Sequence, residues 1–258
     1  MSMLPLFQTR LAESTDRLLT TVAALTDDDL RAPSRLPGWT RGHVVSHLAR
    51  NADSLVNLLN WARTGIPTPQ YASPEDRVAG IEAGAPRPAK EQLLDLEDSA
   101  ARFAALAAEL TESDWTVRVS GANPPDHPAW YVLRRRQREV EIHHGDLGCG
   151  YDWPDWPEDF VLWDFYDTMR SWRPGSAVLG EIVVHTGEDR IAGETWSGLG
   201  EGPTVEGTRR DLFAWLTGRA GGDRLSADGP LPTLPPWPYG SAPAGLPSRI
   251  PEEWPPAI

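Results

Sequence analysis

The sequence predicts an N-terminal all-α four-helix bundle in residues 1–150, a small α+β domain in residues 151–228 and a Pro-rich extended tail in residues 229–258. Three observations support this division. Apolar residues recur at helical spacing up to about residue 150. Short strand-like segments begin after residue 180, and ten prolines fall within the last 30 residues.

The first two helices are predicted from clear apolar stripes. One stripe covers residues 4–25, after which three aspartates at 27–29 interrupt the pattern. Thr40 is a suitable N-cap for a second helix that continues to about Arg63. The second stripe consists of Val44, Leu48, Asn51, Leu55, Leu58 and Ala62.

A long connection and two further helices complete the predicted bundle. Residues 65–88 are rich in Pro, Gly and Ala, which predicts a crossover loop. An apolar stripe from Leu93 to Leu110 predicts the third helix, and the fourth is expected from about His127 to Leu147. Four amphipathic helices with one long connection are typical of a bundle.

The second domain is predicted from mixed elements. A joint rich in Trp and Pro at 152–157 precedes an expected helix at 158–172. Residues 181–186 and 190–196 have the composition of short strands. Thr208 can cap a last helix, since Asp211 follows at capping-box spacing.

The proline-rich tail is not expected to form helix or sheet, because proline fixes φ and lacks an N–H donor. We expect residues 229–258 to lie along the surface as an extended segment. Trp237 and Trp254 are the expected anchors.

Composition limits the classes of partner. The chain has 24 Lys and Arg against 37 Asp and Glu, a net charge of −13. An acidic surface repels phosphate, so we expect no nucleic-acid and no membrane partner. No secretory signal is recognisable and no apolar run approaches the ~18 residues of a membrane span, so we expect a cytoplasmic protein. Cys149 is the single cysteine, which excludes an internal disulfide and a cysteine-built zinc cage.

A divalent-metal site is the strongest chemical signal in the sequence. His43 and His47 lie one helical turn apart, and so do Glu139 and His143 on the predicted fourth helix. Catalytic zinc takes three N and O ligands and keeps one position open. A histidine of the second helix with Glu139 and His143 would supply that set inside a bundle.

Helical geometry selects among the candidates. His47 lies on the apolar stripe, whereas His43 lies in the first turn; His143, unlike His144, is four residues from Glu139. Glu141 is expected to be solvated on another face. A histidine on a helix stripe is commonly only a hydrogen-bonded polar group, but two such pairs on adjacent helices favour a metal. The first pair lacks the glutamate of a His-Glu-x-x-His protease.

Two segments resemble a known family. These are residues 36–53, which contain Leu-Pro-Gly-Trp-Thr-Arg-Gly-His-Val-Val-Ser-His, and residues 138–147, which contain Arg-Glu-Val-Glu-Ile-His-His-Gly-Asp-Leu. They resemble the metal-binding domain of the mycothiol-dependent maleylpyruvate isomerases, which belong to the DinB-like four-helix bundles. Residues 60–75 and 216–222 are also similar to that family. The resemblance covers roughly residues 3–228.

The resemblance implies a site and a reaction. It implies Zn2+, or another divalent metal, held by His47, Glu139 and His143, with mycothiol as thiol cosubstrate. It implies that Arg219 of the second domain is catalytic and that Arg77 meets a substrate carboxylate. In the family's reaction, a metal-bound thiolate adds to the cis double bond of maleylpyruvate, the bond rotates and the thiol is eliminated. Such an isomerase would serve aromatic degradation.

Other side chains receive simpler interpretations. Cys149 follows a helix C-terminus, where the helix dipole disfavours a thiolate, so any reacting thiol is expected to come from a cosubstrate. The arginines 134–136 and 138 form either a solvated helix face or the mouth of the cleft.

Two other functions remain open at this stage. A mycothiol S-transferase would use the same metal site to conjugate the thiol to an electrophile, and would consume one thiol per turnover. A non-catalytic zinc- or ligand-binding protein would tolerate a closed site. The sequence does not indicate an oligomeric state.

Overall fold

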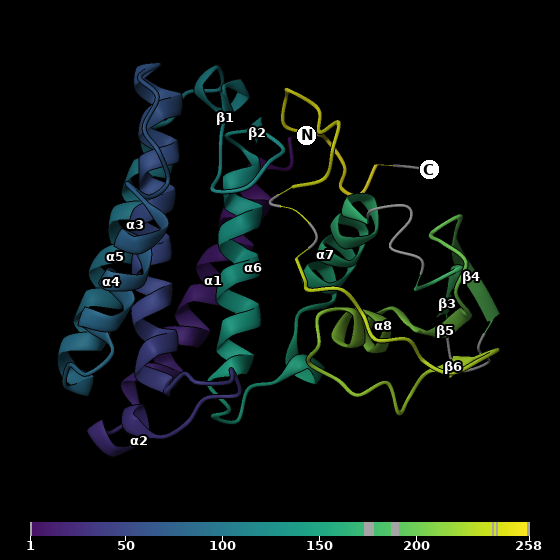
Figure 1. The fold of residues 1–258 in the computed structure, drawn as a ribbon. Helices are drawn as coiled ribbons and strands as arrows, with labels where there is room; N and C mark the ends of the chain where they lie inside the picture. Colours follow the sequence, from purple (N-terminus) through teal and green to yellow (C-terminus); the bar gives the residue numbers. More distant parts are fainter. Residues whose placement is uncertain (1, 173–177, 187–190, 239, 241, 257–258) are drawn as a thin grey trace. The chain divides into compact units, whose positions relative to one another are not determined.

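The computed structural model describes residues 2–172, 178–186, 191–238, 240 and 242–256, without the side chains of residues 186, 191 and 192. The chain is rich in helix and has a small sheet (Figure 1). It divides into two compact units. The first comprises Met1–Asp152 and Gly245–Ile258, and the second comprises Trp153–Ala244.

Long helices form the framework of the first unit: α1 (Leu4–Ala23), α3 (Arg41–Thr64), α5 (Ala89–Glu109) and α6 (Tyr131–Asp146). Helix α3 packs against α5 and α6, and α1 packs against α6 and α5. Their apolar stripes are buried between them. The stripe predicted for α3 lies in this core, with Val44, Leu48, Leu55 and Leu58 fully buried.

Thr40 caps α3 as predicted. Its side chain accepts a hydrogen bond from the backbone N–H of His43, and Nδ1 of His43 accepts one from the backbone N–H of Thr40. The helix ends at Gly65, whose φ of +71° is a left-handed conformation that glycine adopts without strain. These two signals set the length of the helix that carries His47.

The predicted loop over residues 65–88 is wrong in its central part, which forms helix α4 (Pro74–Gly84). Ser73 accepts a hydrogen bond from the N–H of Asp76, and Pro74 occupies the first turn, where proline is tolerated. Gly84 packs so closely on Ser46 of α3 that a Cβ atom would lie 2.2 Å from its Oγ. Gly84 and Ser46 thus allow α4 and α3 to pack closely. Small residues such as Gly84 also weaken the apolar stripe by which a helix is predicted from the sequence.

Two further boundaries differ from the predictions. Helix α1 ends at Ala23, and the aspartates at 27–29 begin a short helix, α2 (Asp27–Arg31), which is capped by Thr26. Helix α6 begins at Tyr131 rather than at His127, because residues 127–128 form a short strand, β2 (His127–Pro128), paired with β1 (Arg118–Val119). A short 3-10 helix, η1 (Asp114–Thr116), precedes β1.

The arginines of α6 are not a solvated face. Arg134, Arg136 and Arg138 are at most 9% exposed. Arg136 donates to the carbonyl of Leu48, and Arg138 donates to the hydroxyl of Tyr131. Helix α6 is covered on nearly every side, so its polar residues must find partners within the unit.

The second unit combines two helices with a small sheet. Its sheet order is β4 (Ile191–Ser197), β3 (Glu181–Thr186), β5 (Thr204–Thr208), β6 (Ser226–Ala227). Strand β3 pairs antiparallel with β4 and parallel with β5. The strands β5 and β6 were not among the predicted elements, and residue 190, where the second strand was expected to begin, lies outside the described residues.

The two helices of the second unit begin where the sequence predicts them. Helix α7 (Glu158–Ser171) follows a 3-10 turn, η2 (Trp153–Asp155), and α8 (Arg209–Leu216) is capped by Thr208. The side chain of Thr208 accepts a hydrogen bond from the N–H of Asp211 at 3.2 Å. None of the described helices is long and apolar enough to cross a membrane.

The described residues after Gly229 form no helix or strand. In the second unit, Trp237 donates a hydrogen bond to Thr168 at 3.2 Å. In the first unit, the ring of Trp254 lies 5.5 Å from that of Trp130, which donates to the carbonyl of Pro247 at 3.0 Å. Pro247 and Trp254 therefore take part in the packing of the first unit.

Candidate metal centre

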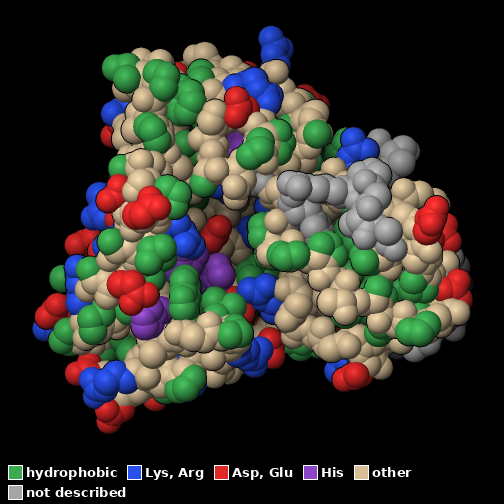
Figure 2. All heavy atoms as spheres, viewed as in Figure 1, with side chains coloured by type: hydrophobic (Ala, Val, Ile, Leu, Met, Phe, Trp, Pro, Cys, Tyr) green, Lys and Arg blue, Asp and Glu red, His purple; other side chains and the backbone are tan. Residues whose placement is uncertain are grey.

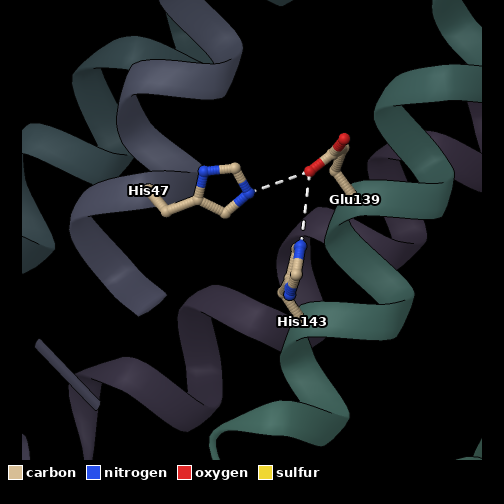
Figure 3. A group of neighbouring side chains, drawn as sticks. All are labelled: His47, Glu139 and His143. Carbon is tan, nitrogen blue, oxygen red and sulfur yellow. Dashed lines mark hydrogen bonds and ion pairs between the residues drawn. The ribbon is translucent and has the colours of Figure 1, made fainter. Parts of the chain in front are cut away.

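His47, Glu139 and His143 come together between α3 and α6 (Figure 3). The Nε2 atom of His47 lies 2.9 Å from Oε2 of Glu139, and Nε2 of His143 lies 3.4 Å from the same oxygen. One ligand atom from each of the three side chains lies within 4.8 Å of the others. The three side chains thus point to a common centre, as the helical spacing predicted.

The two metal-ligand candidates of α6 lie on the one face of the helix that is not fully buried. Every residue of α6 is buried except Arg135, Glu139 and His143. These are four residues apart, so they form a single stripe along one face of the helix. Histidine atoms are visible on the face of the helical unit drawn in Figure 2, beside basic and acidic side chains.

The surroundings of the cluster favour a neutral imidazole on His47 and an ionised carboxylate on Glu139. Burial lowers the pKa of His47 to about 4. Burial also opposes ionisation of Glu139, but hydrogen bonds with His143 and His47 outweigh it and hold the pKa of Glu139 well below its ordinary value. For His143, burial is outweighed by Asp146 and Glu139, which raise its pKa. These surroundings therefore favour a neutral His47, an ionised Glu139 and the protonated form of His143.

Asp146 is a site residue that the sequence interpretation missed. Its Oδ2 lies 2.8 Å from Nδ1 of His143, and the carboxylate is 2% exposed. A carboxylate that accepts a hydrogen bond from Nδ1 fixes the tautomer that leaves Nε2 free to bind a metal. The spacing of three residues between His143 and Asp146 on one helix was the available signal.

Arg77 lies beside the cluster. It belongs to α4, in the segment where a loop was expected, and its Nη2 is 3.4 Å from Nδ1 of His47. Its guanidinium lies 5.9 Å from the centre of the Tyr71 ring. Both side chains line a cavity of about 610 Å³ formed with Trp61 and the segment 120–123.

Arg219 lies in the second unit, just after α8. Its Nη1 donates to the carbonyl of Thr217 at 2.5 Å, and its guanidinium lies 5.9 Å from the ring centre of Trp237. With Trp153 and Arg224 it lines a cavity of about 290 Å³. Its catalytic role remains a prediction.

The residues that the sequence placed outside the metal site have other partners. His43 caps α3, as described above. Glu141 is 1% exposed rather than solvated, and it accepts hydrogen bonds from Ser14, Arg17 and Tyr151. His144 stacks on Tyr151 and hydrogen bonds to Thr21. Burial raises the pKa of the Cys149 thiol, consistent with an unreactive side chain.

The residues fit a zinc-type cation. Two imidazole nitrogens and one carboxylate oxygen form a donor set found in catalytic zinc sites, and three protein ligands leave a coordination position open. The ligand atoms are close enough to share one ion. Asp146 supplies the supporting carboxylate that such histidines commonly have.

Comparisons with known proteins identify the family of the chain. The family described as "Mycothiol maleylpyruvate isomerase N-terminal domain" matches residues 11–148, more than half of the chain. The chain belongs to the mycothiol maleylpyruvate isomerase family. The matched segment contains His47, Glu139 and His143.

Solved structures extend the likeness of this family member to most of its length. The crystal structure of the mycothiol-dependent maleylpyruvate isomerase has a TM-score of 0.75 and 27% sequence identity, and the match covers 90% of this chain and 96% of that chain. The structure of a mutant of that enzyme, with one histidine replaced by alanine, has a TM-score of 0.76 over the same shares.

Two relatives share a shorter region. A "Putative metal-dependent hydrolase" of Geobacillus kaustophilus (strain HTA426) is 35% identical over 107 residues, which are 41% of this chain and 60% of that protein. One of Geobacillus thermodenitrificans (strain NG80-2) is 30% identical over 132 residues, which are 51% and 74% of the two chains. This chain thus spans less than two thirds of the first relative.

Proposed function

We propose that this protein is a metal- and mycothiol-dependent cis-trans isomerase of maleylpyruvate or a similar small dicarboxylate. The observation that carries the proposal is the cluster formed by His47 of α3 with Glu139 and His143 on the accessible stripe of α6. The likeness to the solved isomerase over 90% of the chain supports the same reaction. The proposal includes a DinB-like four-helix bundle as the metal-binding unit and a cytoplasmic location.

His47, Glu139 and His143 would hold the cation, with Zn2+ as our proposed ion. When bound, such a cation stabilises the thiolate form of a thiol at its open position at neutral pH. The protein supplies no competing thiol there, since Cys149, its single cysteine, is not among the three ligands.

The proposed reaction is an addition of the thiol followed by its elimination. The mycothiol thiolate adds to the cis double bond, which forms a C–S bond and leaves an enolate. Rotation about the new single bond and return of the electron pair expel the thiolate and leave the trans product. The enolate and the two carboxylates are anions, so Arg219 and Arg77 are proposed to bind them, because a guanidinium stays charged and can make two parallel hydrogen bonds.

A mycothiol S-transferase is the second candidate. It would use the same ligands, because the metal cluster does not identify the electrophile. The two relatives named as metal-dependent hydrolases share part of this region with the chain, so the region also occurs in proteins named for a different chemistry. A non-catalytic zinc-binding protein is the third, and a metal site without an open position would support it.

One experiment separates these functions. Purified zinc-loaded protein is incubated with maleylpyruvate, with and without mycothiol, while fumarylpyruvate and free thiol are measured together. The isomerase proposal predicts product only with mycothiol and no loss of thiol. Loss of one thiol per product supports a transferase. No product under any condition contradicts the isomerase proposal.

A further inference from the structure

The accessible stripe of α6 holds a third residue besides the two metal ligands. Arg135, Glu139 and His143 are the residues of α6 that are not buried. Four residues of helix correspond to a rise of about 6 Å. Arg135 therefore lies one turn from Glu139 on the face that carries the metal ligands.

Neutral groups hold the guanidinium of Arg135. Its Nη2 donates to Oε1 of Gln70 at 3.0 Å, and its Nη1 donates to Nε2 of His127 at 3.1 Å. Burial lowers the pKa of His127 to about 3, so this imidazole is neutral and acts as an acceptor. Neither partner carries a negative charge.

Arg135 also has no ion pair with a carboxylate among the described residues. Other arginines of the unit do: Arg17 pairs with Glu141, Arg50 with Asp95, and Arg102 with Asp53. The charge of Glu139 acts on Arg135 from one turn away without a direct ion pair, so the hydrogen-bonding edge of the guanidinium is oriented by neutral acceptors and can bind a further anion. Arg135, Glu139 and His143 are each half-buried rather than fully buried.

The wall behind Arg135 belongs to the cavity that Arg77 lines. Gln70 and Gly121 both line this cavity, and a Cβ atom on Gly121 would lie 2.7 Å from Nη1 of Arg135. Gly121 therefore leaves the room that the guanidinium occupies. The cavity has the apolar side chains of Trp61 and Tyr71 on its wall and a volume of about 610 Å³.

We propose that Arg135 binds a carboxylate of the acidic substrate one helical turn from the metal centre, and so makes the site selective for dicarboxylates. This inference rests on the proposed function for the identity of the substrate. Arg135 and Arg77 then supply two cations from the first unit alone. A ligand with only one carboxylate would leave one of these charges without a partner.

Calorimetry on the zinc-loaded protein tests the proposal without turnover. The probes are maleate, a cis-dicarboxylate, and maleamate, in which an amide replaces one carboxylate. The wild type should bind maleate about 10- to 100-fold more tightly than maleamate, as expected for one charge-assisted hydrogen-bonded pair. In Arg135→Gln this preference should fall to about threefold or less, whereas Arg135→Lys should keep part of it.

Two more variants keep the test decisive. Gly121→Ala leaves the charge but displaces the guanidinium, so it should also reduce the preference for maleate; it serves if Arg135→Gln does not fold. Arg102→Gln, on the exposed surface of α5, is the matched control and should behave as wild type. Zinc content and melting temperature are measured for all variants.

The outcomes separate this inference from the proposed function. If Arg135 only supports the segment around Gly121, Arg135→Gln will change the melting temperature and keep the preference for maleate, which overturns the proposal. Equal affinity of the wild type for the two ligands, or no binding of maleate, also overturns it. Failure to isomerise maleylpyruvate, with the preference lost in Arg135→Gln, would contradict the proposed reaction and support the carboxylate site.

Discussion

Oδ2 of Asp146 lies 2.8 Å from Nδ1 of His143, while Nε2 of the same ring faces Glu139. The buried carboxylate thus holds the imidazole from behind and presents its other nitrogen to the centre. This contact joins two residues that are three positions apart on one helix.

Replacing Asp146 should weaken metal binding without removing a ligand. In Asp146→Asn the negative charge behind His143 is lost, so we expect a 10- to 100-fold loss of zinc affinity, as for other supporting carboxylates. Competition with a chelating dye measures it. An affinity equal to wild type would mean that the contact does not support the metal site.

Removing His47 should abolish stoichiometric metal binding. His47→Ala deletes the ligand that α3 contributes, so bound metal should fall well below one equivalent while helicity by circular dichroism is retained. His43→Ala is the matched control on the same helix, because His43 lies outside the cluster. Full metal content in His47→Ala would refute the ligand assignment.

Zinc affinity should rise with pH around neutrality. The ion must displace the proton of His143, whose pKa is raised, whereas Glu139 is already ionised and His47 is already neutral. Below the pKa of His143, each unit of pH should therefore change the apparent affinity by up to about tenfold. Titrations between pH 6 and pH 8 check the sign; a flat profile would contradict the protonation of His143.

His127 should make the metal-free protein sensitive to acid. Its pKa is about 3 when folded and about 6.5 when unfolded, so the unfolded chain binds more protons between these values and stability falls as the pH drops below about 6.5. We expect His127→Gln to reduce the difference in unfolding free energy between pH 7 and pH 4.5 by roughly 2–3 kcal/mol. Urea unfolding at both pH values measures it, and an unchanged difference would contradict the assignment.

Arg219 should matter for turnover and not for metal. Arg219→Ala is expected to keep one equivalent of zinc and to lose at least about 100-fold in kcat/KM, the size of effect typical for a lost stabilising contact to a developing anion. Metal analysis and the fumarylpyruvate assay together check this. A fully active variant would show that Arg219 has only a local role beside Thr217.

The parts of the molecule that the sequence predicts well follow local rules. The span of α3 depends on Thr40, Gly65 and an uninterrupted stripe, and all are visible in the sequence. The spacing of Glu139 and His143 places them on one face of any helix, so the ligand pair could be derived before the fold was known.

The parts that the sequence does not predict depend on contacts between distant segments. Helix α4 was hidden because Gly84 serves close packing against Ser46, which local propensity does not record. Arg136 and Glu141 are buried because other elements pack around α6. The sequence does not predict this burial, because charged residues are usually exposed. Arg135 was not singled out because Gln70 lies 65 residues away in the sequence, and because His127 was expected to belong to the same helix rather than to strand β2.

The contact of Trp254 with Trp130 also has a consequence for biosynthesis. The first unit takes its segments from both sides of the second unit in the sequence, and Met3 donates a hydrogen bond to the carbonyl of Pro251 at 2.9 Å. A nascent chain that ends at Asp152 has all the metal ligands but lacks these closing contacts. The helical unit is therefore completed only after the entire second unit has been synthesised.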